Sequence, residues 1–104
     1  PRTGAVLTNA AETLFALNDA ERAEAVAQQV LALQPPATDA QRRVAWTVLA
    51  HTAFDGGRFD IAERAYGEVL VLTPAQAAGR NELVERQAAA IYKQGEAARD
   101  AGRA

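Results

Sequence analysis

Large and small apolar residues alternate at helical spacing through the middle of this chain, on both sides of a glycine pair. Trp46 and Leu49 precede Gly56-Gly57, and Tyr66 follows it. Alanines lie between these large side chains, at Ala50, Ala53 and Ala62. Small residues let two antiparallel helices approach closely, while large apolar side chains fill the seam between them. The pattern predicts a helical hairpin that is closed by Pro74.

The order of these residues resembles the tetratricopeptide repeat (TPR), in which tryptophan, leucine, a small residue and later aromatics are followed by a closing proline. The signature positions of the pattern are held by Trp46, Leu49, Ala50, Ala53, Gly57, Phe59, Ala62, Tyr66 and Pro74. The chain departs from the pattern at Ala53, where tyrosine is usual, and at Val69, where alanine is usual. The resemblance implies an all-α, right-handed solenoid of antiparallel helix hairpins with about five helices, because one hairpin cannot bury its apolar face alone.

The resemblance divides the chain into units at about 4–37 and 43–76, with a partial unit at 81–104. The first unit matches mainly on its second helix, and it has Leu7 in place of tryptophan. Pro35 and Pro74 are 39 positions apart (74 minus 35), about five more than the family period, so we expect the second unit to be tilted. We expect 1–104 to be a single domain and a fragment of a longer repeat protein, because it opens at Pro1 without an initiator methionine.

Apolar periodicity and helix caps predict five helices and no strand. The helices span about residues 5–17, 20–34, 39–54, 59–72 and 81–99. Asp19 is a good N-cap for the second, and Thr38-x-x-Gln41 has the form of a capping box for the third. Pro35-Pro36 ends the second helix, and Asp55-Gly56-Gly57 ends the third. The core is expected to contain Trp46, Leu49, Ala50, Ala62, Tyr66 and Leu70.

The sequence determines two features near the carboxyl end less well: the start of the last helix and whether that helix ends at Gly95. Residues 73–76 form a second capping-box sequence, which predicts a short turn before Gly79, and Asn81 is the expected cap of the last helix. Gly95 lies where the turn of a third repeat would fall. A lone glycine costs a helix only about 1 kcal/mol, so whether the helix ends there stays open.

Composition excludes several classes of function. The 104 residues carry a formal net charge of −2 and no basic stripe, so we expect no nucleic-acid partner. The chain has no cysteine, hence no disulfide and no thiolate site. No apolar run approaches the roughly 20 residues that cross a bilayer, so no membrane insertion is expected. The cellular localisation stays open.

His51 is the only histidine, and Asp55 follows it by one helical turn. Such a pair can act as a general base with an orienting carboxylate. The chain has no serine or cysteine for it to activate, and a lone histidine makes a poor metal site. We therefore expect no catalytic residue, no metal and no cofactor, with His51 either solvated or lining a groove.

In TPR proteins the first helix of each unit lines a concave groove, and the resemblance places candidate partner-binding residues there. They are Val44, Thr47, His51, Phe54, Asp55, Glu82, Glu85, Tyr92 and Lys93, joined on the first helix by Thr8, Glu12 and Phe15. The alternative is an ordinary solvated face. The basic groove residues with which some members bind the carboxylate of chaperone tails are absent, because Thr47, His51, Glu82 and Glu85 hold those positions.

These features predict a non-enzymatic protein–protein interaction or assembly scaffold with a protein or peptide partner. The alternative is a structural spacer or regulatory appendage of a larger enzyme or envelope protein. A homodimer through the C-terminal helix is a further expectation, because no following helix covers Leu83, Ile91 and Tyr92.

Overall fold

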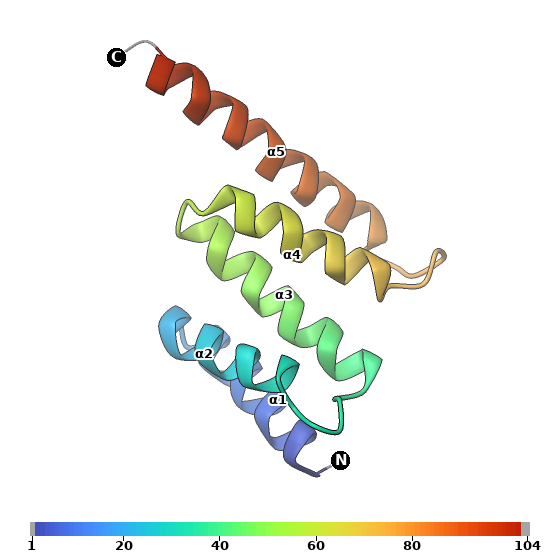
Figure 1. The fold of residues 1–104 in the computed structure, drawn as a ribbon. Helices are drawn as coiled ribbons and strands as arrows, with labels where there is room; N and C mark the ends of the chain where they lie inside the picture. The colour runs from blue at the N-terminus through green and yellow to red at the C-terminus, as the bar shows by residue number, and fades with distance from the viewer. Residues whose placement is uncertain (1, 103–104) are drawn as a thin grey trace.

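The computed structural model describes residues 2–102 and contains five α-helices in this span, with no strand. They are α1 (Arg2–Ala16), α2 (Ala20–Leu31), α3 (Asp39–Asp55), α4 (Phe59–Val71) and α5 (Arg80–Gly102). Two hairpins, α1–α2 and α3–α4, lie one above the other, and α5 crosses the outer side of α4 (Figure 1). The predicted all-α class is confirmed. Pro1 and residues 103–104, the outer ends of the expected units, lie outside the described residues.

Most helix bounds agree with the prediction to within a few residues, and two differ in an informative way. α2 ends at Leu31 rather than at Gln34, so the chain has left the helix before the proline pair. α5 begins at Arg80, which puts Asn81 inside its first turn. The helix also runs through Gly95 without a break, so this lone glycine is absorbed. None of the helices in the described span is long and apolar enough to cross a membrane.

The predicted caps of α2 and α3 are confirmed. The Asp19 carboxylate accepts a hydrogen bond from the backbone N–H of Arg22 at 3.3 Å. The Gln41 backbone N–H donates to the Thr38 hydroxyl, and the Thr38 backbone N–H donates to the Gln41 side chain, both at 3.1 Å. This reciprocal pair is a complete capping box, which satisfies backbone donors that the helix leaves without partners.

The two hairpin turns have the same backbone geometry, 39 positions apart (58 minus 19). Asn18 and Gly57 both have positive φ, at 62° and 78°. The next residues, Asp19 and Arg58, have φ/ψ of −91°/72° and −90°/70° and precede α2 and α4. Asparagine and glycine are the residues that enter the left-handed region most readily, so each turn carries a residue suited to it.

The core follows the same spacing. Buried side chains pair up 39 positions apart as Ala11 with Ala50, Ala23 with Ala62, and Val30 with Val69. The pair Ala27 and Tyr66 differs: both are fully buried, but the second hairpin carries the large ring. Of the residues predicted in the core, Leu49, Ala50, Ala62 and Tyr66 are buried. Trp46 and Leu70 are only half-buried, and Trp46 lies against the core beside Leu31 and Ile61 at the surface.

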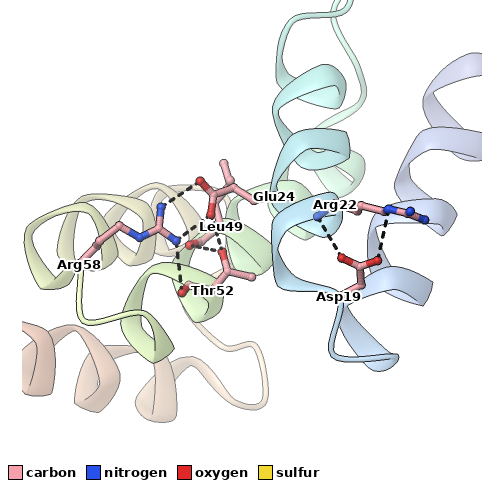
Figure 2. A network of polar contacts seen from close by, with 6 residues as sticks. All are labelled: Asp19, Arg22, Glu24, Leu49, Thr52 and Arg58. Atoms are coloured by element: carbon pink, nitrogen blue, oxygen red, sulfur yellow. Dashed lines mark hydrogen bonds and ion pairs between the residues drawn. The ribbon is translucent and has the colours of Figure 1, made fainter.

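A charged contact joins the two hairpins (Figure 2). The Arg58 guanidinium donates two hydrogen bonds to the Glu24 carboxylate, at 3.0 and 2.8 Å, and the Thr52 hydroxyl donates to the same carboxylate at 3.4 Å. The hydrogen bonds from Arg58 lower the pKa of Glu24 despite partial burial. A bidentate pair of this kind fixes geometry as well as distance, so it orients α2 relative to the second hairpin.

Hydrogen bonds from two glutamine side chains of α5 join α4 to α5. The Gln94 amide donates to the Glu63 carboxylate at 2.7 Å and to the Phe59 carbonyl at 3.3 Å, and the Gln87 amide donates to the Glu63 carbonyl at 3.3 Å. The carboxyl half of α5 extends past the end of α4 (Figure 1). Beyond Gln94, which still contacts α4, nearly all residues of α5 up to Gly102 are exposed.

Candidate functional site

A groove lies between α1, α3 and the start of α5, with a cavity volume of about 520 Å³. Most of its surface is apolar. It is lined by Glu12 and Phe15 of α1, by Arg43, Val44, Thr47, Val48 and His51 of α3, by Val69 and Thr73 at the end of α4, and by Ala77, Ala78, Gly79 and Leu83. Side chains far apart in the sequence therefore meet in one concave surface.

The α3 wall owes its direction to helical spacing. Val44, Thr47, Val48 and His51 recur at intervals of three or four residues, which places them on one helix face. The Thr47 hydroxyl donates to the Arg43 carbonyl at 2.8 Å, so its methyl group is left for the groove. Thr8 makes the same bond to the Gly4 carbonyl at 2.6 Å, but Thr8 is buried and lies outside the groove.

A loop after α4 forms the far wall, and Arg80 fixes it. The Arg80 guanidinium donates to the carbonyl oxygens of Leu70 and Thr73, both at 2.9 Å. The Leu70 carbonyl belongs to the last turn of α4, where carbonyls lack partners within the helix, and Thr73 lies in the loop itself. Residues 77–79 are small, and Gly79 has a positive φ of 85°, so the loop turns without filling the space in front of α3.

His51 lies in the wall of the groove and is held by two aromatic rings. Its ring stacks on Phe15 at a centroid distance of 5.7 Å and 21° between the ring planes. Its Nδ1 lies 2.6 Å from the hydroxyl of the fully buried Tyr66. Burial lowers the pKa of His51, and the nearby positive charge of Arg86 lowers it further. His51 is therefore neutral at pH 7.

The Tyr66 hydroxyl acts as the donor in this contact. Burial raises the pKa of Tyr66 above its usual value, so the phenol keeps its proton. The neutral His51 ring then accepts at Nδ1 and carries its own proton at Nε2, which is the donor that His51 can offer to a ligand. Asp55, the orienting carboxylate considered from the sequence, raises the pKa of His51 only through its charge. The hydrogen-bond partner of the ring is Tyr66.

The structure places some of the sequence-predicted groove residues in this groove and others elsewhere. Val44, Thr47 and His51 line it, together with Glu12 and Phe15. Phe54 instead packs edge-to-face on Phe59 at 5.1 Å. The remaining candidates are exposed outside the groove: Asp55 at the end of α3, and Glu82, Glu85, Tyr92 and Lys93 on α5, where Lys93 pairs with Glu96 at 3.4 Å.

Sequence reasoning missed the end of α4 and the loop that follows it. Val69 and Thr73 lie in the groove because the loop carries the chain away from α3 before α5 begins. The available signal was the run Ala77-Ala78-Gly79, since three small residues leave room that larger side chains would fill. Within residues 2–102, no group of three or more histidine, cysteine, aspartate or glutamate side chains could hold a metal ion.

The groove therefore offers an apolar surface with one neutral imidazole donor and two charged residues, Glu12 and Arg43, at different walls. The His51 ring contacts Phe15 and the hydroxyl of Tyr66. Comparison with protein-family models, with curated proteins and with solved structures found no match to this chain.

Proposed function

We propose that this chain is a non-enzymatic interaction module of the TPR type, and that the groove between α1, α3 and α5 binds a short peptide segment of a protein partner. The observation that carries the proposal is the open, largely apolar groove of about 520 Å³, lined by residues of four helices and a loop. Ligand sites in proteins are concave, largely apolar and furnished with a few polar groups that fix orientation.

The shared geometry of the turns and the buried pairs, 39 positions apart, supports a repeat of two helix hairpins, with about five more residues per unit than the TPR period. Two hairpins with the same turn geometry and the same buried alanines are what a structural repeat requires. Stacked repeats present extended concave surfaces, and proteins built from them work by binding partners.

The lining of the groove indicates the chemistry of the peptide. Val44 and Leu83 are partly exposed and favour an apolar side chain of the ligand, while Val48 and Val69 in the same wall are buried. His51 favours a hydrogen-bond acceptor next to that side chain, such as a peptide carbonyl, because its free nitrogen carries a proton. We therefore expect the motif to be one large apolar residue in an extended segment, without a requirement for net charge.

A displayed peptide library, selected against the purified chain, tests the proposal. Binding of the selected peptides is then measured by fluorescence anisotropy on the unaltered chain and on two variants. Val44→Glu puts a carboxylate in the groove, and Val71→Glu makes the same change at an 80% exposed site at the end of α4. We expect Val44→Glu to weaken binding by about tenfold or more and Val71→Glu to leave it unchanged.

Two results would count against this function. One is the recovery of no peptide above background, which favours the spacer or appendage alternative. The other is equal loss of binding in both variants, which places the peptide outside the groove. Urea unfolding of both variants checks that each chain is folded.

A further inference from the structure

We propose that the outer face of α5 binds the same face of a second copy of this chain, with the two helices antiparallel. The face is formed by residues that alternate four and three positions apart: Asn81, Val84, Ala88, Ile91, Gly95, Ala98 and Gly102. We name this set the α5 seam. All seven residues are exposed, and six of them are apolar or glycine.

The seam has the spacing that pairs two helices along their length. Apolar residues repeating every 3.5 positions form the contact of a coiled coil. Every seventh position holds a small residue, at Ala88, Gly95 and Gly102, so two backbones can approach closely there. Val84 and Ile91 are 47% and 51% exposed, and they supply the bulk between the small positions.

One face of α5 already packs against α4. The seam lies outside that face and stays available to a partner. Ala90 is fully buried, and Gln87 and Gln94 donate hydrogen bonds to α4. The seam lies roughly 100° around the helix from these residues, between them and the exposed row Glu85, Tyr92 and Arg99, and it shares none of its members with the groove.

Charge complementarity selects a second copy and its direction. Glu85, Tyr92 and Arg99 form a row beside the seam, seven residues apart, and all three are exposed. If Tyr92 lies opposite Tyr92 of the second copy in an antiparallel pair, Glu85 lies opposite Arg99, and the contact occurs twice by symmetry. Ala88 then lies close to Gly95. A parallel pair would instead place Glu85 opposite Glu85, where like charges repel.

The size of the face sets the expected strength. A helix of 23 residues is about 34 Å long, so the contact is short compared with interfaces of about 1,600 Å². We therefore expect a dissociation constant in the micromolar range, with dimers at high protein concentration and monomers at low.

Sedimentation equilibrium over a series of concentrations tests the dimer. Ile91→Glu puts a charge in the centre of the seam and should raise the dissociation constant by about tenfold or more. The matched control is Val6→Glu on α1, where the side chain is 60% exposed and off the seam; it should dimerise as the unaltered chain does. Val84→Glu is a second seam variant, used if Ile91→Glu fails to fold.

Charge exchange tests the direction. Glu85→Arg alone should weaken the dimer, since it places arginine opposite Arg99 twice, and adding Arg99→Glu to the same chain should restore it. A chain that stays monomeric at every concentration would overturn the proposal, as would a dimer that survives both seam variants. Failure of the double exchange to restore association would overturn the antiparallel register.

Discussion

The two hairpin turns share one backbone but use their N-cap position differently. In the first turn Asp19 caps its own helix, α2. In the second turn Arg58 makes no side-chain cap, and its guanidinium reaches Glu24 in the first hairpin instead. The same local geometry thus serves helix formation at one place and the joining of hairpins at the other. The turn sets the position of the Cα atom. The residue type then decides whether the side chain caps its own helix or bonds to the other hairpin.

The largest predicted effect tests the difference between the hairpin cores. Tyr66 fills the place that Ala27 holds in the first hairpin, so Tyr66→Ala should leave a cavity in the second hairpin alone. We expect a loss of about 3–5 kcal/mol in the free energy of unfolding, measured by urea denaturation. The control is Tyr92→Ala, which removes a ring that is 61% exposed and should change stability little. Equal losses in the two variants would contradict the assignment of Tyr66 to the core.

The next effect breaks the shared turn geometry. Gly57 has a φ of 78°, and no atom lies within 4 Å of where a Cβ would be, so Gly57→Ala tests backbone conformation without a clash. We expect a loss of about 1 kcal/mol in unfolding free energy. Gly57→Asn transfers the residue of the first turn, Asn18, and should cost less. An alanine variant as stable as the asparagine variant would show that the two turns do not share this constraint.

A double-mutant cycle sharpens the comparison of the N-cap residues. The Glu24 and Arg58 side chains are 25% and 42% exposed, so solvent screens their contact, and we expect a coupling energy of about 1 kcal/mol between Glu24→Gln and Arg58→Gln. The pair Asp39 and Arg42, three residues apart within α3, is the matched control and should couple by about 0.3 kcal/mol. Similar couplings for both pairs would mean that the contact between hairpins adds nothing beyond an ordinary surface pair.

The smallest predicted effects concern pH. His51 of the second hairpin and Glu24 of the first should lower the stability of the chain in different pH ranges. The pKa of His51 is lowered in the folded chain, so the unfolded chain binds more protons, and stability should begin to fall as the pH drops through about 6.5. The pKa of Glu24 is also lowered, so its contribution is present above about 4.5 and is lost as the pH falls below that value. Thermal melting across this pH range measures both steps.

Two variants assign these steps. His51→Gln should remove the decline that starts near pH 6.5, because His51 is the only histidine of the chain. Glu24→Gln should leave that decline in place and reduce the loss below pH 4.5. A decline near pH 6.5 that persists without His51 would show that the burial of His51 is not its cause.

Local signals in the sequence were sufficient for the helices. Asp19 and the Thr38–Gln41 box mark helix starts through bonds that span three residues, and such bonds can be inferred from residue types alone. The contacts that join the hairpins and hold the groove wall link residues farther apart in the sequence. Glu24 and Arg58 are 34 residues apart, and His51 and Tyr66 are 15 apart, so neither pairing follows from helix spacing.

Only part of the candidate site could be predicted, because it too combines local periodicity with contacts between residues far apart in the sequence. The face of α3 that carries Val44, Thr47 and His51 follows from helical periodicity. Which residues of α5 approach that face depends on the course of residues 72–79, which no periodic pattern governs. Leu83 therefore enters the groove, while Glu82 and Glu85 stay outside it. Trp46, expected in the core, packs against it but is only partly buried, because its neighbours on α2 and α4 do not close over it.

The hydrogen bond between the Tyr66 hydroxyl and His51 links the groove to the core, so binding in the groove should change the thermal stability of the chain. One end of this bond belongs to the largest fully buried side chain, and the other end belongs to the groove wall. A compound that settles against the imidazole and holds the ring in its neutral form would raise the melting temperature. A screen that records only thermal shifts would thus detect occupancy of the groove before the natural partner has been identified.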